Sequence, residues 1–149
     1  MLRVGDTAPD FELPDESNTP RKLSMLLADG PVVLFFYPAA MTKGCTAESC
    51  HFRDLAAEFA KVGAQRVGIS TDTVAKQKEF SEKHSFDYPL LSDADGTVSK
   101  EFGVKRSLDL LRVKRATFVI GKDRVIVEVI NSELNMNTHA DKALAALGA

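Results

Sequence analysis

Residues 32–54, VVLFFYPAAMTKGCTAESCHFRD, pass from an apolar run through a short loop into an amphipathic segment. Every residue from Val32 to Phe36 is apolar, which is typical of a strand buried on both faces in a parallel sheet covered by helices. The run ends at Tyr37-Pro38, and a helical pattern begins at Gly44-Cys45 after a loop of small residues. The stretch predicts a central strand that leads directly into a helix.

Cys45, one of two cysteines in the chain, lies at the expected N-terminus of this helix. The first backbone N–H groups of a helix and its dipole favour an anion. A thiol in this position is therefore shifted toward the thiolate, the nucleophilic form of cysteine. We interpret Cys45 as a residue used for chemistry; the alternative is a small buried apolar residue.

The composition is that of an ordinary globular protein. The 149 residues are 44% hydrophobic and 27% charged with a net charge of -2, and a chain of this length fits one domain, residues 1–149. No basic block favours nucleic acid or an anionic membrane, and no stretch approaches transmembrane length. The N-terminus does not resemble a secretory signal, so we expect a cytoplasmic protein, where two cysteines are more often catalytic, redox-active or metal-binding than structural.

The remaining chain alternates predicted strands with predicted helices. We expect strands at 66–70, 88–91, 116–120 and 125–130, and helices from about 45 to 62, at 74–84 with Thr73 as cap, at 98–102 and at 138–147. The first 30 residues predict an edge hairpin near 11–13 and a brief turn at 25–27 capped by Ser24. This order favours an α/β fold with a mixed central sheet flanked by helices and an N-terminal β extension over it.

The loop has the spacing Pro38-x-x-x-Thr42-x-x-Cys45, preceded by FFY and followed by TAESCHFRD. This pattern resembles the active-site signature of the peroxiredoxins. VGDTAPDFELPD near the start, GISTD, YPLLSDADGTVSKEFGV, RATFVI and the closing His139-Ala140 extend the similarity over nearly the whole chain. The sequence most resembles the bacterioferritin comigratory protein, or peroxiredoxin Q, subgroup. The resemblance implies one thioredoxin-like alkyl hydroperoxide reductase/thiol-specific antioxidant domain that reduces hydrogen peroxide and organic hydroperoxides.

The resemblance also implies roles for individual residues. Cys45 would be the peroxidatic thiolate that becomes a sulfenic acid, and Arg115 the cation beside it. The Thr42 hydroxyl would hydrogen-bond thiolate and peroxide, and Pro38 would shield the site. Alternatively, Arg115 is a surface charge beside a strand with Arg112 in its place, Thr42 is a turn residue and Pro38 only ends the strand.

Cys50 matches the position of the resolving cysteine in part of this subgroup, where it would form a disulfide with Cys45 after oxidation. Five residues along an intact helix leave the Cα atoms about 8–9 Å apart. A disulfide tolerates at most about 7 Å, so the first turns of the helix would have to unwind. A thioredoxin or similar dithiol protein would then reduce the bridge. The alternative is a bystander thiol.

Several polar residues have plainer interpretations. Glu48 and Arg53 lie on the predicted helix, where a solvated face or a local ion pair is as good an explanation as catalysis. The three histidines and two cysteines match no zinc spacing, so we predict structural or exposed histidines, with no metal or cofactor. Ala39-Ala40-Met41 and Lys43 depart from residues common in the subgroup, so the resemblance does not extend to loop stiffness, peroxide preference or reductant docking.

Two other function classes compete with the peroxidase. A thioredoxin-like disulfide oxidoreductase would favour Cys-x-x-Cys and a proline before the later strand, whereas this chain has Cys-x-x-x-x-Cys and Arg115-Ala116. A redox-sensing interaction module could use the same cysteine pair, and turnover with a reductant distinguishes it. For assembly, we expect a monomer or a weak homodimer.

Overall fold

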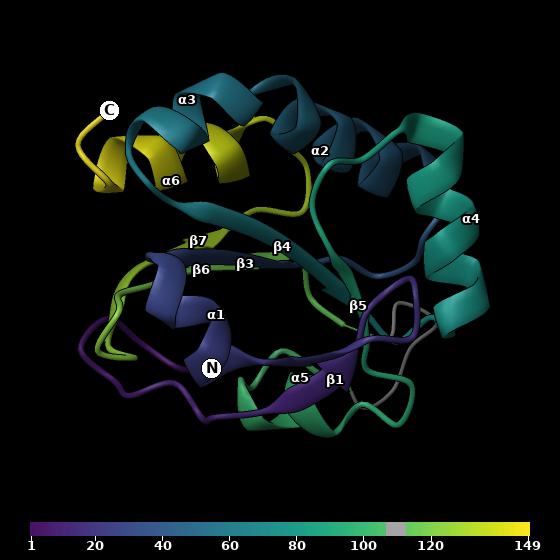
Figure 1. Ribbon diagram of the computed structural model, residues 1–149, viewed down its shortest axis with the longest axis horizontal. Coiled ribbons are helices and arrows are strands. Elements are labelled where there is room, and N and C mark those ends of the chain that lie inside the picture. Colours follow the sequence, from purple (N-terminus) through teal and green to yellow (C-terminus); the bar gives the residue numbers. More distant parts are fainter. Residues whose placement is uncertain (107–112) are drawn as a thin grey trace.

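The computed structural model describes residues 1–106 and 113–149 (Figure 1). The strands are β1 (Glu12–Pro14), β2 (Pro20–Lys22), β3 (Val32–Phe36), β4 (Gln65–Ser70), β5 (Leu90–Ser92), β6 (Ala116–Ile120) and β7 (Ile126–Asn131). The helices are α1 (Leu23–Leu26) with a 3-10 turn at Leu27–Asp29, α2 (Lys43–Asp54), α3 (Ala56–Lys61), α4 (Val74–His84), α5 (Thr97–Glu101) and α6 (Thr138–Ala146).

The predicted mixed sheet is confirmed, with β3 as its central strand. The strand order is β5-β4-β3-β6-β7. β3 pairs in parallel with β4, and β4 with β5, whereas β6 runs antiparallel to both β3 and β7. All five residues of β3 are buried, as the uninterrupted apolar run predicts. β1 and β2 form the predicted N-terminal hairpin, a separate antiparallel pair.

The sheet separates two apolar cores, and alternate residues of β3 belong to different ones. Val32, Leu34 and Phe36 pack with α1, α5 and the N-terminal segment, below the sheet in Figure 1. Val33 and Phe35 face the other way, toward α2, α3 and α6 above the sheet. A buried strand of this kind fixes the position of the helix that follows it, because both of its faces are packed.

The long helix expected from about 45 to 62 is two helices, so that prediction is wrong in detail. Leu55 leaves helical geometry, with φ -98° and ψ 21°, and separates α2 from α3. The carbonyl of Phe52, at this end of α2, accepts a hydrogen bond of 3.0 Å from Nη1 of Arg66 on β4. A side chain distant in sequence thus satisfies a helix-end carbonyl, and the local sequence contains no glycine or proline that would predict the break.

Most other expected elements agree with the structure to within one or two residues, and one expected cap does not. Thr73 caps α4 as predicted, since its Oγ1 accepts from the backbone N–H of Lys76 at 3.2 Å. Ser24 does not cap a turn: α1 begins one residue earlier, and the Ser24 N–H donates to Oδ1 of Asp10 at 2.9 Å. An aspartate from the preceding segment takes the place of the local hydroxyl.

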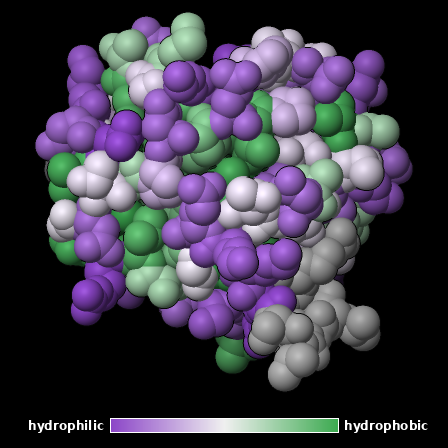
Figure 2. Space-filling model, turned by 90° about the horizontal axis from the view of Figure 1, so that it is seen from below, coloured by the Kyte–Doolittle hydropathy of each residue, from purple (hydrophilic) through white to green (hydrophobic). Residues whose placement is uncertain are grey.

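Figure 2 shows the face formed by the N-terminal segment, α1 and α5, with hydrophilic residues interspersed among apolar ones. Met25, on α1, is 72% exposed there. Across residues 1–106 and 113–149, no helix has the length and apolar character needed to cross a membrane.

Phe35 provides a test of the packing that joins β3 to α2. Its ring is fully buried and stacks on Phe52 of α2 with centroids 4.1 Å apart. We expect Phe35→Ala to lower the free energy of unfolding by about 3–5 kcal/mol in urea denaturation, because it removes a buried ring and leaves a cavity. Leu134→Ala is the control: Leu134 is 93% exposed, and we expect a change within about 0.5 kcal/mol. Equal effects of the two substitutions would contradict this account of the core.

Candidate active site

The loop between β3 and α2 is held by several buried hydrogen bonds. The Tyr37 hydroxyl donates to Oε1 of Gln77 at 2.7 Å, and the backbone N–H of Ala40 donates to Oδ2 of Asp72 at 2.7 Å. Pro38, between them, is buried. The chain therefore enters α2 from a fixed position, with Thr42 as N-cap and Cys45 in the first turn.

Cys45 and Arg115 meet at the junction of β3 and α2. Cys45 is fully buried, Arg115 is 6% exposed, and Nη2 of Arg115 donates to Sγ of Cys45 at 3.3 Å. β6 explains how residues so far apart in sequence come together. It runs antiparallel to β3 with Ala116 opposite Phe36, so Arg115 lies beside the end of β3, where the loop of residues 37–42 (the active loop) begins. The sequence predicted this pair of residues from the family resemblance.

Glu48 and His139 extend the site on the other side of the guanidinium. Nη1 of Arg115 donates to Oε1 of Glu48 at 2.8 Å, and Oε2 of Glu48 lies 3.5 Å from Nδ1 of His139. Glu48 and His139 are both fully buried. The solvated-face interpretation of Glu48 is therefore wrong: it pairs with a residue of another element. The spacing could have predicted this position, because a residue three positions after Cys45 lies on the same face of the helix and therefore near the same partners.

Burial dominates the electrostatics of this network. It raises the pKa of Glu48 from 4.5 to about 8, although the charge and the hydrogen bond of Arg115 act in the opposite direction. Burial likewise lowers the pKa of His139, with a hydrogen bond to the Ser132 carbonyl opposing it and the charge of Arg115 adding to it. Both groups are thus shifted toward their neutral forms.

Thr42 and Cys50 lie close to Cys45 in the chain, but the structure does not join their side chains to its sulfur. The Thr42 hydroxyl donates to the carbonyl of Ala39 at 2.8 Å. Cys50 is a free, half-buried thiol in the same unbroken helix as Cys45, which is also free. Burial raises the pKa of the Cys50 thiol, and the charge of Arg53 lowers it in part. The structure is that of a reduced chain with α2 intact.

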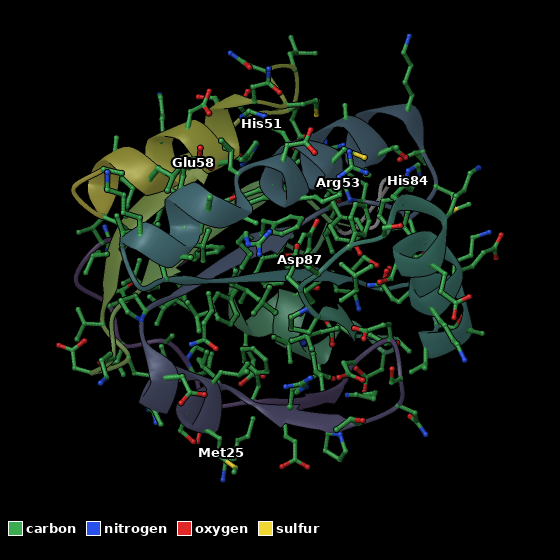
Figure 3. All side chains as sticks on the ribbon, turned by 45° about the horizontal axis from the view of Figure 1, so that its top comes forward. Met25, His51, Arg53, Glu58, His84 and Asp87 are labelled. Carbon is green, nitrogen blue, oxygen red and sulfur yellow. The ribbon has the colours of Figure 1, made fainter. Side chains whose placement is uncertain are left out.

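The other polar residues considered from the sequence take structural positions. Figure 3 shows Arg53 and His84 near each other on α2 and α4, where Nη1 of Arg53 donates to the His84 carbonyl at 2.8 Å. Arg53 also forms an ion pair with Asp54, which agrees with the local-pair alternative for this residue. His51 contacts Asp141 at 2.8 Å. Within the described ranges no three histidine, cysteine or acidic side chains group as metal ligands would. Arg112, the alternative to Arg115, lies outside the described residues.

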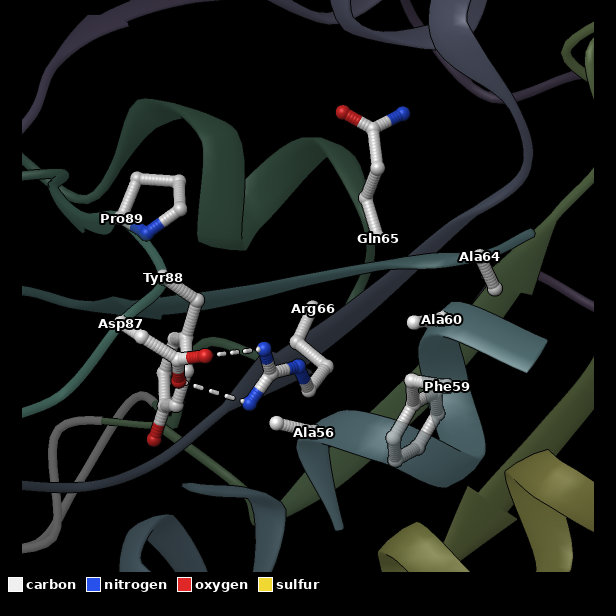
Figure 4. Close-up of a pocket in the computed structure, with 9 residues that line it drawn as sticks. All are labelled: Ala56, Phe59, Ala60, Ala64, Gln65, Arg66, Asp87, Tyr88 and Pro89. Carbon is white, nitrogen blue, oxygen red and sulfur yellow. Dashed lines mark hydrogen bonds and ion pairs between the residues drawn. The ribbon is translucent and has the colours of Figure 1, made fainter. Parts of the chain in front are cut away.

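Figure 4 shows a pocket of about 290 Å³ between α3 and the segment before β5. Its charged groups are already paired: Arg66 donates to both carboxylate oxygens of Asp87 at 2.9 and 2.8 Å, and lies over the ring of Tyr88. The hydroxyl of Tyr88 donates to the Ser49 carbonyl at 2.7 Å. This region therefore holds the later half of α2 in place through backbone carbonyls. The pocket is not the reactive site, since Cys45 does not line it.

A buried cysteine with a guanidinium at its sulfur, at the start of a helix that follows the central strand of a mixed sheet, defines a thiol-based oxidoreductase site. The AhpC/TSA family model matches residues 4–129. The peroxidoxin BcpB of Mycobacterium tuberculosis is 66% identical and superposes with a TM-score of 0.96, over 99% of this chain and 97% of that one.

Two further relatives indicate the subgroup. Chloroplastic peroxiredoxin Q of Sedum lineare is 40% identical over 96% of this chain and 76% of that protein. A structure of Xanthomonas campestris peroxiredoxin Q is 32% identical, with a TM-score of 0.85 over 93% of this chain and 89% of that one. The chain therefore belongs to the AhpC/TSA family, among the peroxiredoxins of the peroxiredoxin Q and bacterioferritin comigratory protein group. The predicted thioredoxin-like fold and the class of peroxidase oxidoreductases are confirmed.

Gly44 gives a test of the contact between Arg115 and Cys45. A Cβ built on Gly44 would lie 3.2 Å from Nη2 of Arg115 and 3.6 Å from the side chain of Met136. We expect Gly44→Ala to displace the guanidinium and to slow the reaction of Cys45 with peroxide about tenfold, the effect of losing about 1.4 kcal/mol of stabilisation. Its melting temperature should change little, because the helix preference of alanine over glycine, at most about 1 kcal/mol, offsets the weakened contacts of the buried guanidinium.

Ala47→Gly, at an exposed position of the same helix, is the matched control. It should lower the melting temperature without slowing the first reaction with peroxide. A Gly44→Ala protein that is both stable and as reactive as the wild type would contradict a need for close approach at this glycine.

Proposed function

We propose that this protein is a thiol-dependent peroxidase that reduces hydrogen peroxide and organic hydroperoxides through Cys45, with residues 1–149 acting as one AhpC/TSA domain. The observation that supports it most directly is the guanidinium of Arg115 at 3.3 Å from the buried sulfur. A structure of the bacterioferritin comigratory protein of Xanthomonas campestris, 32% identical to this chain, is described in terms of alkyl peroxide reduction. That description supports organic hydroperoxides as substrates.

The first chemical step requires Cys45 as a thiolate. A positive charge in hydrogen-bond contact favours the ionised sulfur, since an opposite charge nearby stabilises the charged form. The thiolate attacks the terminal peroxide oxygen, the O–O bond breaks, and the alkoxide takes a proton and leaves as alcohol or water. Cys45 becomes a sulfenic acid. Arg115 also stabilises the negative charge that develops on the peroxide oxygens.

Thr42 and Pro38 have supporting roles in this proposal. Pro38 is buried in the loop and limits water around the sulfur. The Thr42 hydroxyl, which donates to Ala39 in the reduced protein, would turn toward the incoming peroxide. The N–H groups of Gly44 and Cys45 at the start of α2 are further donors for the peroxide oxygens.

The second step is a disulfide between Cys45 and Cys50, formed when the Cys50 thiol attacks the sulfenic sulfur and water leaves. Because both residues lie in α2, the helix must unwind locally. Its later half is held to other elements by Tyr88 at the Ser49 carbonyl, Arg66 at the Phe52 carbonyl and Arg53 at the His84 carbonyl. We therefore expect residues 43–48 to unwind while Cys50 stays near its present position.

A dithiol protein of the thioredoxin type would return the disulfide to two thiols by exchange. Such a cycle suits a reducing cytoplasm, where a thioredoxin pool is available. We propose a monomer or a weak homodimer as the working form.

Cysteine variants test the cycle. Peroxide-dependent loss of NADPH should occur with the wild type and a thioredoxin system, be absent in Cys45→Ser, and fall at least about tenfold in Cys50→Ser, because no intramolecular thiol then captures the sulfenic acid. Full activity of Cys50→Ser would show that Cys50 is not the resolving residue. If the wild type does not turn over but Cys45 still forms a sulfenic acid, thioredoxin is not the reductant. If Cys45 does not react with peroxide at all, the proposed peroxidase activity is refuted.

Hydrogen exchange tests where α2 unwinds. After one equivalent of peroxide, we expect the amides of residues 46–48, the first to be hydrogen-bonded within α2, to lose protection while those near Arg53 keep it, because only the later half is anchored to α4 and β4. The Cys50→Ser protein is the control: it forms the sulfenic acid but no disulfide, so its loss of protection should be smaller than that of the wild type. Loss of protection that begins instead at the end of α2 would contradict this order.

A further inference from the structure

Oε2 of Glu48 is a buried carboxylate oxygen without a hydrogen-bond partner in the described part of the chain. Its neighbour Oε1 accepts from Arg115, so the two oxygens have unequal surroundings. Nδ1 of His139 is 3.5 Å from Oε2. An ionised buried oxygen left without a donor is costly, whereas a proton placed between these two atoms satisfies both.

The surroundings of His139 fix which ring nitrogen faces Glu48. Nε2 lies 2.8 Å from the carbonyl of Ser132, and because a carbonyl only accepts, Nε2 must hold a hydrogen. Nδ1 lies 2.8 Å from Oγ1 of Thr117 on β6 and faces Glu48 on its other side. Nδ1 can make one strong hydrogen bond at a time: in the neutral ring it accepts from the Thr117 hydroxyl or from a protonated Oε2, and in the charged ring its hydrogen is shared between Oγ1 and Oε2. A protonated Oε2 and a charged ring each place one proton on the pair.

We infer that Glu48 and His139 share one proton, that the pair is therefore electrically neutral, and that this leaves the charge of Arg115 directed at the sulfur of Cys45. His139 is then a positioning residue that acts on Cys45 through Glu48 and the guanidinium. The inference rests on the proposed function and extends it to a residue that does not touch the sulfur.

Charge balance explains why the proton matters. With the proton present, Arg115 has one buried anion to stabilise, the Cys45 thiolate, and the transition state adds negative charge there. Without it, Glu48 becomes a second buried anion on the same guanidinium, and the stabilisation is divided. Besides Arg115 and Cys45, the ionisable group among the described residues that faces the pair is Glu133, whose Oε1 accepts from the Arg115 backbone N–H and whose charge opposes further negative charge on Glu48.

The sign of the pH dependence follows from the pKa of Glu48, which burial raises to about 8. Below this pH the pair holds its proton, and the charge of Arg115 stabilises negative charge at Cys45 alone. As the pH rises through this value the proton is lost, and the rate constant for the first reaction with peroxide should fall. From pH 7 to pH 9 the protonated fraction declines about tenfold for a single group titrating near 8, and because the ionised form keeps part of the stabilisation by Arg115, we expect the rate to fall by at most this factor.

The experiment compares wild type with Glu48→Gln, whose amide oxygen can accept from Arg115 and whose NH₂ can donate toward His139 in place of the proton. The rate constant for reduced protein with hydrogen peroxide is measured by competition with a second peroxidase, since the chain has no tryptophan for fluorescence. We expect the alkaline decline to disappear in Glu48→Gln and to persist in Glu58→Gln, a control on the exposed face of α3. An undiminished decline in Glu48→Gln would overturn the inference.

A second measurement locates the proton without activity. At pH 7, infrared spectra of the wild type should contain the carbonyl band of a protonated carboxyl group that is absent in Glu48→Gln, or ¹⁵N NMR should show both ring nitrogens of His139 protonated. Finding neither would overturn the shared proton even if Glu48→Gln does not fold. A wild type that reacts with no peroxide at any pH would instead refute the proposed function, and the spectra would still decide the proton.

Discussion

The structure depends on the burial of one positive charge. The guanidinium of Arg115 is almost entirely removed from water, and a buried charge is tolerated only where partners of opposite charge and hydrogen-bond acceptors surround it. Cys45 and Glu48, one helical turn apart on α2, supply these partners at 3.3 and 2.8 Å. In the proposed mechanism the guanidinium that these partners hold in the interior also stabilises the negative charge that develops in the reaction with peroxide, so one interaction contributes to both stability and reactivity.

Sheet topology is what makes this contact possible. β3 delivers the active loop and α2 from its carboxyl end, and the antiparallel β6 begins beside that end because Ala116 pairs with Phe36. If β6 ran parallel to β3, its first residue would lie beside the first residue of β3, at the opposite end of the strand from Cys45. The antiparallel pairing of β6 with β3 thus brings Arg115 to the site, and α6 contributes His139.

The sequence predicted features governed by local pattern and missed those that depend on distant packing. The apolar run of β3 and the bounds of β6 were predicted to the residue, and the position of Cys45 at a helix start followed from spacing. Arg115 was found through family resemblance alone, since no local pattern links it to Cys45. The break at Leu55 and the buried state of Glu48 involve Arg66 on β4 and Arg115 just before β6, both distant in sequence from α2.

Gly44 connects the two demands that the proposed cycle makes on α2. The helix must present the sulfur to Arg115 in a fixed geometry, and it must also unwind at its first turn when Cys50 reacts. A residue without Cβ lets the guanidinium approach the backbone at this turn, where a methyl group would come within 3.2 Å of Nη2. The same residue weakens the helix locally by about 1 kcal/mol relative to alanine. In the reduced state Arg115 compensates for this weakness through Cys45. When Cys45 is oxidised to a neutral sulfenic acid the charge attraction is lost, and the glycine leaves the first turn as the least stable part of α2.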